Sequence, residues 1–145
     1  MSIIEALIKL IAGKGKQYGT PSKTKQGKTV RSHGEQQIAD YLHENNIRYQ
    51  HEAPAFAGLF GPKISKPDFY LPDYHVFVEY WGMVDVEDRR TRERYVKNMK
   101  WKMRQYHVHH IKFISIYPSN LDNLDWIFRA KFKKETGKDL PKPIV

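Results

Sequence analysis

Two acidic side chains, Asp68 and Glu79, have the residue type and surroundings that most favour chemistry in this sequence. Each lies in a segment typical of a β-strand, residues 66–71 and 74–81, and the two segments meet across the turn Pro72–Asp73. The alternation of side chains along such a hairpin allows both carboxylates to lie on one side of the sheet. Close carboxylates repel each other, and a hard divalent cation with oxygen ligands is the simplest compensation. The pattern therefore indicates a candidate metal site.

The position of Glu79 strengthens this interpretation. It interrupts an otherwise apolar strand, residues 76–81, where a charge is usually paired or metal-bound. The alternative is that Asp68 and Glu79 are solvated residues of a surface hairpin, which often carries acidic side chains.

The two carboxylates belong to a series of short motifs spread over residues 32–124. In chain order the motifs are Ser32-x-x-Glu35-x-x-Ile38-Ala39-x-x-Leu42, Ile47-x-Tyr49-x-x-Glu52, Lys66-Pro67-Asp68-Phe69, Val78-Glu79-Tyr80-Trp81-Gly82, and Tyr95 with Met99-x-Trp101-Lys102. Their order and spacing resemble the PD-(D/E)XK nuclease superfamily, in particular the small nuclease domains appended to some DNA helicases and, more distantly, the very-short-patch repair endonucleases.

The resemblance implies metal-dependent hydrolysis of DNA phosphodiester bonds, with an endonuclease favoured. By this resemblance Asp68 and Glu79, together with the backbone carbonyl of Tyr80, would hold Mg²⁺ or Mn²⁺. Glu35 would contribute to the metal directly or through water. The superfamily usually has a lysine two positions after the second acidic residue, but Trp81 occupies that position here.

Lys102 is the best candidate to replace the missing lysine, because related nucleases can supply it from the following helix. Lys102 borders the stripe of Tyr95 and Met99 that should face the sheet, whereas Lys97 and Lys100 project to the sides. The alternative is that Lys102 merely extends its stem along the edge of the helix.

Glu35 also has two interpretations. Ser32-x-x-Glu35 is the pattern of a capping box, in which Glu35 bonds back to the helix start and does no chemistry. Alternatively, Glu35 shares the helix face of Ile38 and Leu42, points at the sheet and belongs to the catalytic site.

The elements that must position these residues form an α/β layer arrangement with a mixed four-stranded sheet, the restriction-endonuclease-like core of order α-β-β-β-α-β. The last strand should join the sheet in parallel through the preceding helix. The expected elements are a helix over 32–46, strands over 47–52, 66–71, 74–81 and 111–117, a helix over 88–107, and a final helix capped by Ser119 or Asp122 and ending near 134. Residues 53–65 are expected to be an apolar loop.

Composition narrows the function classes. The chain has 145 residues, 25 Lys+Arg against 16 Asp+Glu, a formal charge of +9 and no cysteine. These values exclude thiolate zinc sites and disulfides, fit a cytoplasmic setting, and favour a polyanionic partner such as DNA. The apolar segment 2–12 is too short to span a bilayer and lacks the features of a signal peptide; it predicts an amphipathic helix.

We expect three regions: the amphipathic helix and a mobile basic arm over 1–31, a nuclease-like domain over 32–134, and a frayed polar tail over 135–145. The arm and the basic helix would contact DNA phosphates, which gives affinity but little sequence choice, so a structure- or partner-directed nuclease is favoured. The candidate DNA-binding residues are Lys14, Lys16, Lys23, Lys25, Lys28, Arg31, His33, Lys97 and Lys100.

Two other functions remain open from the sequence. Trp81 could mark a nuclease scaffold that has lost its lysine and only binds nucleic acid. Alternatively, the chain could be an accessory subunit whose first helix docks on a helicase or on a second copy. Convergence of Asp68, Glu79 and Lys102 would favour the enzyme.

Overall fold

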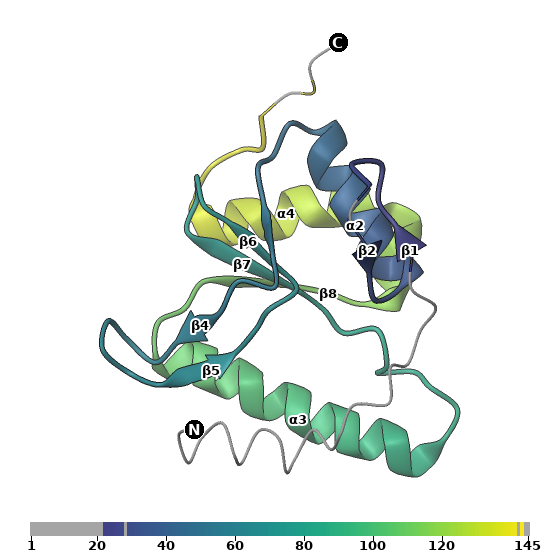
Figure 1. Ribbon diagram of the computed structural model, residues 1–145, viewed down its shortest axis with the longest axis vertical. Helices are drawn as coiled ribbons and strands as arrows, with labels where there is room; N and C mark the ends of the chain where they lie inside the picture. The colour runs from purple at the N-terminus through teal and green to yellow at the C-terminus, as the bar shows by residue number, and fades with distance from the viewer. Residues whose placement is uncertain (1–21, 28, 142, 144–145) are drawn as a thin grey trace.

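The computed structural model describes residues 22–27, 29–141 and 143, and its centre is a mixed sheet of four strands within these ranges (Figure 1). The strand order is β3-β6-β7-β8, with antiparallel pairing from β3 to β7 and parallel pairing between β7 and β8. The α/β class, the hairpin and the parallel last strand are therefore confirmed. The main elements are α2 (His33–Glu44), β3 (Gln50–His51), β6 (Phe69–Leu71), β7 (Val76–Tyr80), α3 (Arg89–Val108), β8 (Phe113–Ile116) and α4 (Leu124–Thr136).

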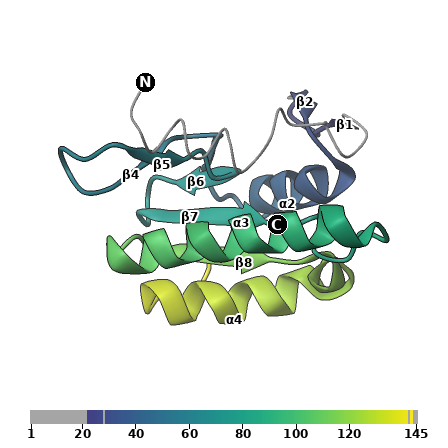
Figure 2. The ribbon, with the colours of Figure 1, turned by 90° about the horizontal axis from the view of Figure 1, so that it is seen from below.

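The sheet is covered on both faces (Figures 1 and 2). On one face, the side chains of Phe69, Leu71, Val76 and Val78 join those of α2 and α4 in the main core. On the other face, α3 and a second hairpin pack over Phe77 and its neighbours in a smaller core. Because strand side chains alternate, Asp68 and Glu79 belong to the face that α3 crosses.

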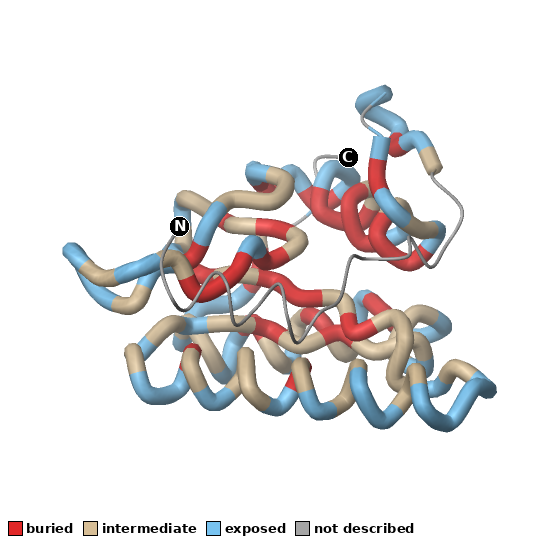
Figure 3. Tube along the Cα trace, turned by 60° about the horizontal axis from the view of Figure 1, so that its bottom comes forward, coloured by how far each residue is buried: buried red, intermediate tan, exposed pale blue. Residues whose placement is uncertain are grey.

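The two large helices begin where their capping residues predict. Ser32 accepts the N–H of Glu35 at the start of α2, and Asp88 accepts the N–H of Thr91 at the start of α3. The outer side of α3 is exposed, whereas burial is concentrated on the central strands and α2 (Figure 3). The final helix differs from the prediction: a 3₁₀ turn, η1 (Pro118–Asn123), comes first, and α4 begins at Leu124.

The expectation of a mobile arm up to residue 31 is wrong for its described part. The strands β1 (Ser22–Lys23) and β2 (Thr29–Val30) pair as a hairpin that contacts α2. Thr24 and Val30 are buried, and the Lys25 backbone N–H donates to Asp40 at 2.8 Å. The expected helix over 2–12 and the residues Lys14, Lys16 and Lys28 lie outside the described residues.

Residues 53–65 are also more ordered than predicted. They form a hairpin of β4 (Ala55–Phe56) and β5 (Lys63–Ser65), with Ala55 and Ile64 buried against α3. The expected strand over 47–52 is shortened to β3, and Ile47 and Tyr49 reach the main core from the irregular segment before it. The tail is not wholly frayed either, since Leu140 packs in that core.

Within the described residues, no helix has the length and apolarity needed to cross a membrane.

Candidate active site

Glu79 lies near the end of β7 and is only 3% exposed. Its Oε1 accepts the hydroxyl of Tyr106 on α3 at 2.6 Å, and that hydroxyl lies 2.5 Å from Oγ of Ser65 on β5. Three elements thus fix the orientation of this carboxylate. A buried carboxylate with such partners is positioned rather than free to rotate.

Asp68 immediately precedes β6 and is partly exposed. Its Oδ2 accepts the backbone N–H of Tyr80 at 2.7 Å, across the β6–β7 pair. The register pairs Phe69 with Val78, which brings Asp68 beside Glu79. The hairpin therefore brings the two predicted carboxylates together, and Asp68 is the one that solvent reaches.

The surroundings of Asp68 and Glu79 disfavour the ionised form of both carboxyl groups. Burial, followed by the charges of Glu79 and Glu35, raises the pKa of Asp68 well above its ordinary value. Burial also raises the pKa of Glu79, although the Lys102 charge and hydrogen bonds from Tyr106 and Asp68 oppose that rise. The charge of Glu79 therefore disfavours ionisation of Asp68, a cost that a bound cation would offset.

Glu35 combines features of both interpretations drawn from the sequence. The Ser32 side chain caps α2, but Glu35 does not complete a capping box with Ser32; its Oε2 accepts the N–H of Arg31 at 3.2 Å. Glu35 is 7% exposed, and its charge raises the pKa of both Asp68 and Glu79. Its Oε2 also lies 3.6 Å from Nε2 of His51. The first turn of α2 thus belongs to the acidic site.

Gly34 permits this close approach of α2. A Cβ at Gly34 would overlap the phenol ring of Tyr80, and a Cβ at Gly82 would lie 2.6 Å from the same ring. The Tyr80 side chain therefore sits where only glycine leaves room on either side. The Tyr80 backbone carbonyl stays a predicted ligand, whereas the Tyr80 N–H holds Asp68.

Lys102 approaches the same site from α3. Its Nζ lies 6.0 Å from the ring centroid of Trp81, and its charge lowers the pKa of both Asp68 and Glu79. The Trp81 indole is buried and donates from Nε1 to Ser115 at 2.9 Å. Lys97 and Lys100 are exposed on the outer side of the helix. Of the three lysines, Lys102 is the one whose charge is among the main influences on the pKa of both carboxylates.

The donor atoms suit a small, hard cation. Among the described residues no group of three or more His, Cys, Asp or Glu side chains is arranged to hold a metal ion. Mg²⁺, however, is commonly bound by one or two carboxylates, with waters and substrate phosphates completing its coordination. Asp68 and Glu79 provide such a pair, and burial raises the pKa of each carboxyl in the absence of a cation.

The structure shows that some of the predicted DNA-binding residues are paired with carboxylates, whereas others are exposed. Lys25 pairs with Glu44, and Arg31 pairs with Glu52 at 2.8 Å, so both help to hold the N-terminal hairpin. Lys23 and His33 are exposed. Along α3 the exposed basic residues are Arg89, Arg90, Arg94, Lys97, Lys100 and Arg104.

Three residues near the carboxylates were not singled out as functional from the sequence. Tyr106 is buried on the inward side of α3, and its hydroxyl partner Glu79 is distant in sequence. Ser65 was placed in a loop. His51 has a buried Nε2 without a hydrogen bond partner beside Glu35. Ser65 could have been found only if β5 had been predicted, because that strand brings its hydroxyl to Tyr106. A strand of three residues is too short for an alternating pattern to be recognised.

No protein-family model, curated protein or solved structure matches this chain. The nuclease interpretation therefore depends on the motifs and on the site geometry.

Proposed function

We propose that the protein is a Mg²⁺- or Mn²⁺-dependent deoxyribonuclease with a restriction-endonuclease-like fold, directed by DNA structure or by a partner rather than by sequence. The convergence of Asp68, Glu79 and the Lys102 charge at one end of a strand pair carries this proposal. A pair of carboxylates beside a lysine is suited to phosphodiester hydrolysis. An endonuclease is favoured by the motif resemblance.

Each residue has a distinct part in the proposed reaction. Asp68 and Glu79 would hold the cation, and Tyr106 and the Tyr80 N–H keep their oxygens oriented. A divalent cation bound there would polarise the phosphoryl oxygen and lower the pKa of a bound water. Lys102 places a positive charge beside the scissile phosphate, where negative charge develops. Glu35 orients water at the buried side of the site.

The outer side of α3 supports DNA as the substrate. Residues 89–104 contain eight Lys or Arg and a single acidic residue, Glu93. Six of the basic side chains are exposed on the helix that also carries Lys102. Their phosphate contacts would give affinity and salt dependence without reading the base sequence.

Trp81 favours a second candidate, a non-catalytic DNA-binding domain. Its indole is buried at the position where the superfamily usually has its lysine. The two candidates differ in the role of Lys102. A nuclease requires its charge at the carboxylates, whereas a binding domain does not.

The test is cleavage of linear, nicked, flapped and branched DNA in Mg²⁺, Mn²⁺ or EDTA. The nuclease proposal expects cleavage with either cation and none in EDTA. Asp68→Asn and Glu79→Gln should abolish cleavage while DNA binding persists, and Asp122→Asn, a change of an exposed carboxylate on η1, should cleave normally. Binding of DNA without cleavage under every cation condition would favour the second candidate.

A further inference from the structure

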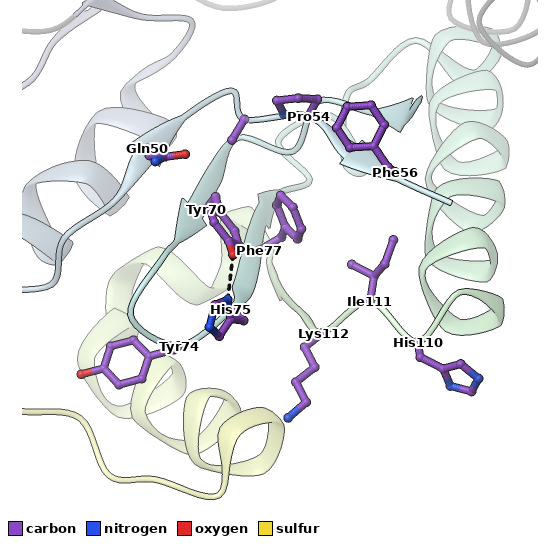
Figure 4. A pocket seen from close by; sticks show the side chains of 11 residues that line it. Gln50, Pro54, Phe56, Tyr70, Tyr74, His75, Phe77, His110, Ile111 and Lys112 are labelled. Carbon is purple, nitrogen blue, oxygen red and sulfur yellow. Dashed lines mark hydrogen bonds between the residues drawn. The ribbon is translucent and has the colours of Figure 1, made fainter. Parts of the chain in front are cut away.

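A pocket of about 630 Å³ opens at the opposite end of the strand pair that carries Asp68 and Glu79 (Figure 4). Its walls come from β4, from the β6–β7 pair, and from the segment between α3 and β8. This volume is typical of small-molecule sites. The lining residues that matter here are Gln50, Phe56, Tyr70, Phe77, Ile111 and Lys112.

The pocket and the carboxylates share one face of the sheet. Phe77 precedes Glu79 by two residues, and Tyr70 follows Asp68 by two residues. Because a strand repeats its face every second residue with a rise of about 3.3 Å per residue, these aromatic rings begin about 7 Å from the carboxylates. Neighbouring nucleotides of one DNA strand could therefore reach both places.

The pocket wall presents aromatic rings. Tyr70 and Phe77 lie in contact, with ring centroids 4.7 Å apart, and the Tyr70 hydroxyl lies 3.1 Å from Nδ1 of His75. Phe56 lines the same pocket from β4 and is 50% exposed, which is unusual for a phenylalanine on a hairpin that packs in a core. The half-exposed ring of Phe56 is suited to stacking on a nucleobase, with the partly buried Phe77 beside it.

The polar groups at the rim suit a nucleotide as well. Lys112 is exposed at the rim, and the Gln50 amide can donate and accept hydrogen bonds at a base edge. Among the described residues that line the pocket, none is acidic. The charge of the rim is therefore complementary to a phosphate.

We propose that this pocket binds an unpaired nucleobase of the DNA substrate, stacked on Phe56 and Phe77 with Lys112 at its phosphate. The inference rests on the proposed function for its substrate, and it adds the class of DNA: a duplex with a single-stranded extension or flap beside the cut. A base within an intact duplex is stacked on both sides and cannot enter.

Binding in EDTA tests the pocket independently of cleavage. Fluorescence anisotropy would compare a blunt duplex with the same duplex carrying a single-stranded extension. Phe56→Ala should weaken binding of the extended DNA by about 5- to 150-fold, the range for loss of one base–aromatic stack, and leave blunt-duplex binding unchanged. Phe56→Leu, which keeps apolar packing but lacks the ring face, should behave like Phe56→Ala. Lys112→Met should weaken the extended DNA to a smaller degree.

Phe60→Ala is the matched control, because Phe60 is 97% exposed on the same hairpin but does not line the pocket. It should leave both affinities unchanged. An abasic position in the extension should reproduce the loss caused by Phe56→Ala, and combining the two should cost nothing further.

Equal affinity of the wild type for both DNAs, equal losses for both DNAs in Phe56→Ala, or an equal effect of Phe60→Ala would overturn the pocket assignment. Such a result would overturn the pocket but not the proposed nuclease activity, which is tested separately by cleavage in Mg²⁺. Conversely, a Phe56-dependent preference without any cleavage would retain the pocket and reject the nuclease.

Discussion

Asp68 and Glu79 oppose folding at neutral pH. Both have a raised pKa, caused first by burial, so the native state holds their protons more tightly than the unfolded chain does. This contribution to stability is complete below the ordinary pKa values of 3.8 and 4.5 and is lost as pH rises through the raised values. An ionised pair without a cation therefore lowers the free energy of unfolding.

We expect Asp68→Asn and Glu79→Gln to raise the Tm at neutral pH while they abolish cleavage. The amides can still accept from the Tyr80 N–H and from the Tyr106 hydroxyl, but they carry no charge. Thermal unfolding across a pH series measures the effect, and the gain over the wild type should shrink at acidic pH. A lower Tm at neutral pH would contradict the electrostatic argument, and retained cleavage would contradict the site.

Cation binding should release a proton from the carboxylate pair. Because the pKa of Asp68 is raised well above its ordinary value, protons compete with Mg²⁺ or Mn²⁺, and the affinity for the cation should increase with pH. Titration calorimetry in buffers of different ionisation enthalpy measures the released proton. Asp68→Asn should abolish the release, whereas a cation affinity independent of pH would contradict the coupling.

Lys102→Met is expected to lower the cleavage rate by about 10²-fold or more, on the order of 3 kcal/mol of transition-state stabilisation. The methionine keeps most of the packing beside Trp81 but removes the charge that acts on Asp68 and Glu79. Single-turnover rates at saturating DNA measure this loss.

Lys97→Met and Lys100→Met are the matched controls for that variant. Both lysines are exposed on the same helix, so their loss should weaken DNA binding with little effect on the saturated rate. The opposite ranking of the three lysines would show that Lys102 is not the catalytic lysine.

At the scale of elements, the contact between α2 and the end of β7 determines where Glu35 lies. Gly34 in the first turn of α2 leaves room for the ring of Tyr80. An added Cβ must displace either the ring or the helix, and the helix carries Glu35. The same strand end carries Glu79, so the displacement reaches the site directly.

We therefore expect Gly34→Ala to destabilise the protein by about 1–3 kcal/mol, as overpacking does, and to reduce cleavage. In an unobstructed helix the same change would raise the free energy of unfolding, so the sign of the measured change tests the argument by itself. Denaturant unfolding measures the change. Tyr80→Leu in the same chain should recover part of the stability by making room; a stabilising effect of Gly34→Ala alone would show that α2 does not approach Tyr80 this closely.

The long elements and the carboxylate pair could be predicted because their signals are local. The period of residues 88–107 and the cap Asp88 place α3, and alternation along two adjacent strands places Asp68 beside Glu79. The hairpin of β4 and β5 could not be predicted, because strands of two or three residues have no recognisable period. Its core partner Tyr106 is also distant in sequence.

The N-terminal hairpin shows a second reason for failure. Residues 13–31 contain no acidic side chain, which predicts an unpacked basic arm. The countercharges lie elsewhere: Lys25 meets Asp40 and Glu44 on α2, and Arg31 meets Glu52 after β3. Composition within a segment cannot reveal partners that only the fold brings near.

At the scale of the whole molecule, the net charge of +9 is unevenly used. Some of the basic side chains are paired with carboxylates within the fold, as at Lys25 and Arg31, whereas the outer side of α3 remains exposed and basic. Affinity for DNA should therefore depend more strongly on α3 than on the paired side chains of Lys25 and Arg31. The predicted basic arm, residues 13–31, contains basic residues that form ion pairs within the fold, Lys25 and Arg31, and others that are predicted to contact DNA, such as Lys14 and Lys16.

Two deletions separate those uses. Removal of residues 1–21 takes away Lys14 and Lys16 but keeps the hairpin and its ion pairs to Glu44 and Glu52. The slope of log affinity against log salt should fall by about 0.9 for each lysine that contacts a phosphate.

Removal of residues 1–31 also takes away the buried Thr24 and Val30 and the ion pairs to α2 and Glu52. It should lower the Tm as well as the slope. If both deletions give the same Tm, the hairpin adds nothing to stability; if neither changes the slope, the N-terminal lysines do not contact DNA and α3 carries the electrostatic affinity.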